Sequence, residues 1–141
     1  MKEKIKSGKV CIVGLGYVGL PLAETFSNHL KTIGFDIDQE KVKRLSESKN
    51  EDNIEFTSDP SKINRADFVL IAVPTPVTKF KEPDLSFVKS AAKTVGKNLN
   101  VIMDCVIVAV AHDEFKNKSF LSTGPFFQTL KSLINKLLEK V

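Results

Sequence analysis

No apolar run in this sequence approaches the roughly 20 residues that a membrane-spanning helix requires. The first ten residues, MKEKIKSGKV, lack the apolar core of a secretory signal, so we expect a cytoplasmic protein. The net charge of +4 is spread along the chain without a basic block or interleaved aromatic residues, which is weak evidence for nucleic-acid binding. Repeats, low-complexity tracts and linkers are also missing, and 141 residues therefore predict one soluble domain.

Cysteine is scarce as well, and histidine equally so. Cys11 and Cys105 both lie inside apolar stretches that resemble strands. Reduced, buried thiols are the favoured interpretation of the pair, ahead of a disulfide or a metal site. We therefore predict no metal site.

What the sequence does contain is an alternation of short apolar strands with amphipathic helices. The expected strands are Lys9–Val13, 31–37, 54–57, 66–74 and 104–111, and the expected helices are Tyr17–Leu30, 38–48 and 84–99. Such alternation favours a parallel sheet with right-handed crossovers. The predicted fold class is therefore α/β, a doubly wound and mostly parallel sheet in a single domain.

Three glycines stand between the first strand and the first helix, in the spacing G-x-G-x-x-G. Gly14 permits a tight turn, Gly16 lets the backbone approach a pyrophosphate, and Gly19 lets the helix lie close to the sheet. The helix N-terminus adds free N–H groups and a partial positive charge. The motif predicts a dinucleotide site, although the same spacing also occurs in simple tight turns.

An acidic residue follows about 20 residues later, where a dinucleotide fold uses a carboxylate to bind the adenosine ribose. Asp36, at the end of the second strand, is the preferred candidate. Asp38 competes for this role, but its position suits a helix cap better. A carboxylate at this place repels the extra phosphate of NADP, so NAD is the predicted cofactor. Asp36 as a merely solvated acid remains an alternative.

Four segments now resemble one family. VCIVGLGYVGLPLAETF, GFDIDQEKV, FTSDPSKINRADFVLIAVPTPV and EPDLSFVKSAAKTVGKNL are together similar to the N-terminal, Rossmann-like NAD-binding domain of the UDP-glucose/GDP-mannose dehydrogenases. Within this family, the UDP-N-acetylhexosamine 6-dehydrogenases are most similar. The resemblance covers about residues 8–99, with a shortening around 48–54. It implies an oxidoreductase of nucleotide-sugar metabolism that acts on a CH–OH donor with NAD as the acceptor.

The resemblance also implies which residues contact NAD. They are Gly14, Leu15, Gly16, Tyr17, Val18, Gly19, Asp36, Lys41, Val73, Pro74, Thr75 and Pro76. Lys41 matches a basic position that reaches the adenosine side of the cofactor, but on the sequence alone a solvated helix lysine is at least as good an interpretation.

Beyond Leu99 the resemblance changes. Residues 1–99 are expected to form the NAD-binding portion. Residues 100–141 resemble a strand and helix from the family's C-terminal domain, and we expect them to pack on the same sheet. A strand from Asp104 to Ala111 would cover the sheet edge beyond ADFVLIAV. The resemblance implies that the central domain, with the catalytic cysteine and lysine, is missing. A natural deletion, a degenerate gene product and an engineered sequence all remain open.

No catalytic residue is therefore assigned. Cys105 is expected inside a buried strand, away from the strand ends where ligands bind. His112 and Asp113 follow that strand, but the resemblance makes them inherited loop residues. His29 is interpreted as a favourable partner for the dipole of the first helix. We expect an NAD-binding module that is not catalytically competent alone.

The alternatives belong to other classes. One is a non-enzymatic, self-associating protein that keeps a relic dinucleotide motif. Its dimer would form through a C-terminal helix at 125–141, whose eight apolar side chains form one stripe. The favoured interpretation of that stripe is packing on the sheet. A third alternative is an active small dehydrogenase that oxidises a simpler alcohol.

Overall fold

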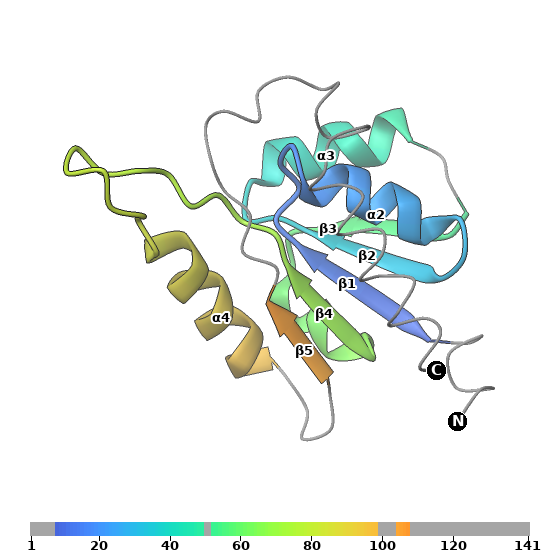
Figure 1. The fold of residues 1–141 in the computed structure, drawn as a ribbon. Helices are drawn as coiled ribbons and strands as arrows, with labels where there is room; N and C mark the ends of the chain where they lie inside the picture. Colours follow the sequence, from blue (N-terminus) through green and yellow to red (C-terminus); the bar gives the residue numbers. More distant parts are fainter. Residues whose placement is uncertain (1–7, 50–51, 99–103, 108–141) are drawn as a thin grey trace.

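The computed structural model describes residues 8–49 and 52–98, and the backbone of 104–107. Strands and helices alternate along this part of the chain (Figure 1). In chain order the elements are β1 (Lys9–Val13), α2 (Gly19–Ser27), β2 (Lys31–Phe35), α3 (Gln39–Ser48), β3 (Ile54–Thr57), η1 (Pro60–Arg65), β4 (Phe68–Ile71), α4 (Ser86–Asn98) and β5 (Asp104–Ile107).

The strands form one parallel sheet in the order β3-β2-β1-β4-β5. The chain moves outward from β1 through β2 to β3, and then returns to place β4 on the other side of β1. In a doubly wound sheet this change of direction opens a crevice at the carboxyl ends of the two central strands. The predicted parallel α/β sheet is therefore confirmed, and its change of direction lies between β1 and β4.

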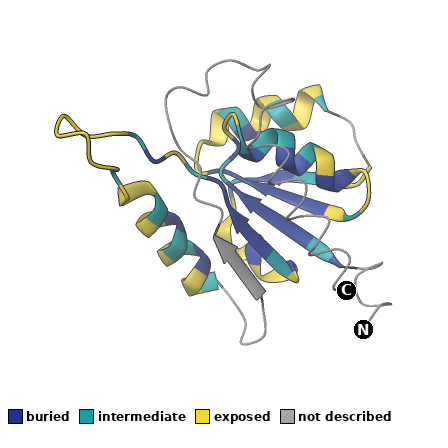
Figure 2. Ribbon diagram, viewed as in Figure 1, coloured by how far each residue is buried: buried dark blue, intermediate teal, exposed yellow. Residues whose placement is uncertain are grey.

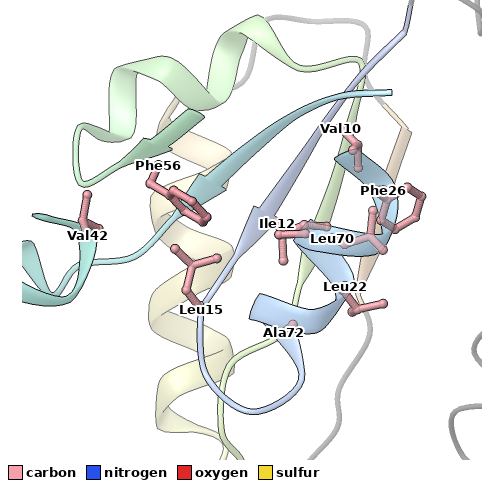
Figure 3. Packing of buried hydrophobic residues seen from close by; sticks show 10 residues of the cluster. Val10, Ile12, Leu15, Leu22, Phe26, Val42, Phe56, Leu70 and Ala72 are labelled. Atoms are coloured by element: carbon pink, nitrogen blue, oxygen red, sulfur yellow. The ribbon is translucent and has the colours of Figure 1, made fainter. Parts of the chain in front are cut away.

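Side chains of β1 alternate between two hydrophobic layers, because successive residues of a strand point to opposite faces. Val10 and Ile12 lie in the layer under α2 and α3, which Figure 3 shows from close by. Cys11 and Val13 lie in the layer under η1 and α4. Both faces of the sheet are covered, which explains why its strands are continuous apolar runs.

Cys11 is fully buried, and its burial raises the pKa of the thiol to about 12. The prediction of a reduced, buried thiol is confirmed for this residue. The side chain of Cys105 lies outside what the structure describes.

Two helix boundaries show how local sequence determines the elements. Asp38 caps α3 by accepting a hydrogen bond from the Lys41 N–H at 3.0 Å, as predicted. The first helix is shorter than the predicted Tyr17–Leu30. His29 and Leu30 both donate their backbone N–H to Phe26 O, and this closing turn leaves His29 beyond the end of α2.

The segment between β4 and α4 projects away from the sheet (Figure 1) and is mostly exposed (Figure 2). Its sequence, rich in proline and lysine, is typical of a loop, but the segment contains an antiparallel bridge between Val77 and Pro83. The Thr78 N–H donates to Glu82 O at 2.8 Å inside this bridge. Phe80, at the turn, is 87% exposed.

β5 pairs in parallel with β4, with Val69 opposite Cys105 and Ile71 opposite Ile107. A strand that starts at Asp104 therefore covers the sheet edge beyond β4, as expected. The remainder of that predicted strand, His112, Asp113 and the predicted helix at 125–141 all lie outside the described residues.

Two searches of the described residues gave negative results. None of their helices is both long and apolar enough to cross a lipid bilayer. The same residues contain no cluster of three or more histidine, cysteine, aspartate or glutamate side chains suited to holding a metal ion.

Candidate dinucleotide-binding site

The turn after β1 requires glycine at its first position. Gly14 has a φ of +99°, a conformation that side-chain-bearing residues rarely adopt. A Cβ at this residue would also lie 2.7 Å from the carbonyl oxygen of Ala72. The Gly14 N–H donates to Phe35 O at 2.8 Å, which fixes the turn against the end of β2.

Gly19 and Gly16 differ in what surrounds them. A Cβ at Gly19 would lie 1.6 Å from the Gly14 carbonyl oxygen, so α2 can begin against the turn only because this side chain is absent. A Cβ at Gly16 would meet no other atom within 4 Å. Gly16 therefore presents bare backbone to open space, which is the feature that a phosphate-binding turn needs.

The N-terminus of α2 is electrostatically open to an anion. Val18 precedes the helix and makes no side-chain cap, and the first turn carries no acidic residue. The partial positive charge of this end is therefore not neutralised by the helix itself. Tyr17, between the glycines, is 63% exposed.

Asp36 lies directly beyond β2 and turns its carboxylate toward the glycine turn. Its Oδ2 accepts the Leu15 N–H at 2.9 Å and the Lys41 ammonium at 3.0 Å. Its Oδ1 accepts the Asp38 N–H at 3.0 Å. One buried carboxylate thus joins the turn after β1 to the beginning of α3.

These contacts determine the charge of the site. Burial raises the pKa of Asp36, but the hydrogen bonds from the Asp38 and Leu15 amides and from the Lys41 ammonium outweigh it. The pKa lies below its ordinary value. Asp36 is therefore ionised at neutral pH, and its negative charge is paired with the positive charge of the Lys41 ammonium.

The two competing acids lie in different surroundings. Asp38 serves as the cap of α3, and Asp36 faces the glycine turn. Lys41 is more than a solvated helix lysine, because its ammonium forms an ion pair with Asp36.

The loop after β4 begins beside the glycine turn. The Ala72 N–H donates to Val13 O at 2.7 Å, which keeps the start of this loop beside β1. Val73 Cγ1 would lie 3.0 Å from a Cβ at Gly14, so Val73 adjoins the glycine turn. Thr75 is buried, whereas Pro74 is exposed. Of the loop residues predicted to contact NAD, Val73 therefore lies against the glycine turn.

Sequence reasoning missed Gly34 and the packing of Leu15. A Cβ at Gly34 would lie 2.8 Å from Phe56 Cδ1 and 3.1 Å from Leu15 Cδ2. Leu15 therefore anchors the turn with its side chain in the core, as Figure 3 shows. A glycine inside a predicted strand was the available signal, since it often marks a close approach of neighbours.

Ile37 is a second residue that sequence reasoning missed. It follows Asp36 directly and is 79% exposed, which is high for an aliphatic side chain. The available signal was an isoleucine between two acidic residues just after a strand.

Comparison with known proteins agrees with this geometry. The model of the UDP-glucose/GDP-mannose dehydrogenase family, NAD binding domain, matches residues 8–51 and 44–112. The match runs through β5, whereas the sequence resemblance was expected to end near Leu99. The expected end of the resemblance was therefore too early.

Curated relatives match somewhat less than two thirds of the chain. Protein CapL of Staphylococcus aureus is 46% identical over 99 residues, which are 62% of this chain and 23% of the relative. The UDP-N-acetyl-D-glucosamine 6-dehydrogenase of Salmonella typhi is 38% identical over 104 residues, which are 65% of this chain and 24% of the relative. The chain thus spans about a quarter of the length of these relatives.

Solved structures share the fold. The UDP-N-acetyl-mannosamine dehydrogenase Cap5O of Staphylococcus aureus superposes with a TM-score of 0.66 at 21% identity, over 89% of this chain and 33% of that chain. Family model, relatives and fold agree. The chain belongs to the UDP-glucose/GDP-mannose dehydrogenase family, and the region matched is that family's NAD binding domain.

Proposed function

We propose that this chain binds NAD with the pyrophosphate over the Gly14–Gly19 turn and the adenosine ribose on Asp36. The observation that carries the proposal is the hydrogen bond from the Leu15 N–H to Asp36 Oδ2, at 2.9 Å. It holds the ribose-binding acid beside the phosphate-binding turn. The spacing of these two groups therefore suits a nucleotide that carries its phosphate and its ribose side by side.

The residues around this pair complete the proposed contacts. Gly16 offers open backbone to the pyrophosphate, and the uncapped end of α2 adds favourable charge. Exposed Ile37 offers an apolar surface to the adenine ring beside the ribose. We propose that the loop at Val73–Pro76 contacts the part of the cofactor that extends beyond the pyrophosphate. When bound, NAD supplies the hydride acceptor, and these residues only bind and orient it.

We further propose that this 141-residue chain does not oxidise a nucleotide sugar by itself. It matches about a quarter of its curated relatives, and no described residue is assigned a catalytic role. Cys11 is unsuited to act as a nucleophile, because it is buried and its pKa is about 12. We also propose that the protein is cytoplasmic.

Calorimetric titration tests the binding step. We expect NAD to bind with a submillimolar Kd and NADP to bind about ten-fold more weakly or worse, because a carboxylate that accepts a ribose hydroxyl offers no donor to a 2′-phosphate. Failure to bind NAD below millimolar concentration, or a preference for NADP, would overturn the proposal.

A second assay addresses turnover. Absorbance of NADH is followed while the protein is incubated with NAD and either UDP-sugars or small alcohols. We expect no NADH to form with either group of substrates. NADH production that depends on the protein would show that the 141-residue chain is an enzyme in its own right.

A further inference from the structure

The ion pair between Asp36 and Lys41 is asymmetric in its exposure. The Asp36 side chain is 9% exposed, whereas that of Lys41 is 34% exposed, and the two charged atoms lie 3.0 Å apart. The carboxylate is therefore the buried partner, and the ammonium is the partner that a ligand in solvent can meet. Lys41 lies in the first turn of α3 and reaches back to the end of β2.

The acceptor positions of Asp36 are nearly all filled. A carboxylate offers about four lone-pair positions, two on each oxygen. Oδ2 already accepts from the Leu15 N–H and from the Lys41 ammonium, while Oδ1 accepts only from the Asp38 N–H. One position on Oδ1 is free, but a ribose presents two neighbouring hydroxyls. The second hydroxyl must therefore meet the ammonium of Lys41 or displace it.

This arrangement gives Lys41 a role in choosing the cofactor, provided that the proposed NAD site is correct. We propose that the Lys41 ammonium is a latent binding group for an adenosine 2′-phosphate. Asp36 holds this ammonium in the ion pair, so the pair rather than Asp36 alone sets the preference for NAD. Lysine ammonium groups are common phosphate partners. With the carboxylate in place, the pair has no net charge to attract the extra phosphate. Without it, the ammonium is free to do so.

Substitutions at the two positions separate their effects. In Asp36→Asn the carboxylate charge is lost and Lys41 is released. NADP should then bind about ten-fold more tightly than it does to the wild-type protein, because the released ammonium gains a charge-assisted hydrogen bond to the 2′-phosphate. Affinity for NAD should fall, because the amide is a weaker acceptor for ribose hydroxyls. In Asp36→Asn/Lys41→Gln the gain in NADP affinity should disappear.

The single variant Lys41→Gln should have the opposite effect on the affinity for NADP. It leaves the Asp36 charge without its partner, so NADP should bind more weakly than to the wild-type protein. Lys43→Gln is the matched control, because Lys43 is exposed on the same helix and the same charge is removed. Combined with Asp36→Asn, this control should preserve the gain in NADP affinity.

The experiment is a calorimetric titration of NAD, NADP, 5′-AMP and 2′-AMP into each folded variant. The two nucleoside monophosphates isolate the effect of the 2′-phosphate from the rest of the cofactor. Melting curves followed by circular dichroism verify that each variant is folded, and Asp36→Ser replaces Asp36→Asn if the latter is not. The gain for Asp36→Asn should shrink as salt is raised.

The outcomes distinguish this inference from the proposed function. If the wild-type protein fails to bind NAD, the proposed NAD site itself is wrong. If the wild-type protein binds NAD but releasing Lys41 brings no gain for NADP or 2′-AMP, the role of Lys41 is overturned. A gain that survives the loss of Lys41 overturns it equally.

Discussion

At the scale of single residues, Asp36 is the point where the site is held together. Its carboxylate accepts hydrogen bonds from the backbone of the glycine turn, from the residue that caps α3 and from the Lys41 side chain. It is buried and yet has a lowered pKa, because these donors favour its charged form. The same contacts that orient its carboxylate in the proposed ribose site also make it part of the folded structure.

Asp36 should therefore make stability depend on pH. Its pKa is lower in the folded protein than in the unfolded chain, so the contribution is present above the ordinary value of about 4 and is lost as pH falls through the folded pKa. The free energy of unfolding should decrease over this acidic range. Urea denaturation at a series of pH values measures this, and Asp36→Asn should show a smaller decrease. Equal decreases for both proteins would contradict the assignment.

The glycines of the turn make a matched pair of predictions. Gly19→Ala should destabilise the protein by about 3 kcal/mol or more, because its Cβ would overlap the Gly14 carbonyl oxygen. Gly16→Ala should change the free energy of unfolding by less than about 1 kcal/mol, because its Cβ meets open space. Urea denaturation measures both.

Substitution of Gly16 should weaken NAD binding although it has little effect on stability. Its alanine variant should remain folded yet bind NAD about ten-fold more weakly, because the Cβ occupies the space proposed for the pyrophosphate. An unchanged NAD affinity in folded Gly16→Ala would place the pyrophosphate elsewhere.

Sequence patterns predicted part of the site at this scale. The spacing of the glycines and the cap at Asp38 depend on local backbone geometry, which a short motif encodes. The ion pair between Asp36 and Lys41 was not predicted, because it depends on the direction of a long side chain across two elements. For the same reason, the hydrogen bond from Leu15 to Asp36 emerged only from the folded arrangement.

At the scale of elements, two glycines in regular structure have opposite environments. Gly96 lies in α4, and a Cβ there would meet no other atom within 4 Å. Gly96→Ala should raise the free energy of unfolding by about 0.5–1 kcal/mol, because alanine loses less backbone entropy in a helix. Thermal and urea denaturation measure the change. A decrease in stability would mean that α4 is not a regular helix at this position.

Gly34→Ala is the contrasting substitution. Its Cβ would approach Phe56 and Leu15 in the core between the sheet and its helices, so it should destabilise the protein by about 1–3 kcal/mol. The two alanine variants together separate helix propensity from close packing. A Gly34→Ala variant as stable as the wild-type protein would contradict the packing described for β2.

The sequence predicted which elements exist and their order more accurately than it predicted where each element begins and ends. β4 was expected at 66–74 but comprises Phe68–Ile71. Ala72 still donates to Val13 O, so the chain leaves the strand gradually. The bridge between Val77 and Pro83 escaped prediction because proline and lysine dominate that segment, and both are typical of loops.

At the scale of the whole molecule, the sheet order explains where a ligand can bind. The turn after β1, the acid after β2 and the loop after β4 follow neighbouring parallel strands, whose carboxyl ends lie at one edge. In doubly wound sheets ligands bind where the strand order changes direction, which here is between β1 and β4. Alternating strands and helices predicted this class of sheet, since parallel strands require crossovers.

A strand covering the outer edge of β4 was also predicted from the sequence. β5 covers the edge of β4, as expected for a strand beginning at Asp104. Self-association through residues 125–141 stays a prediction, because that segment lies outside the described residues. The preference for NAD depends on neither feature, since the residues proposed to bind the nucleotide all lie between Gly14 and Pro76.

The most direct test of the central claim is an amide NMR titration of the full 141-residue chain with NAD. We expect saturable shifts concentrated at Gly14–Gly19, at Asp36–Lys41 and at the amides of Val73 and Thr75, with the amides of α4 unchanged. Shifts confined to other parts of the chain, or no saturable shifts at millimolar NAD, would contradict the proposal that the first crossover and Asp36 bind the cofactor.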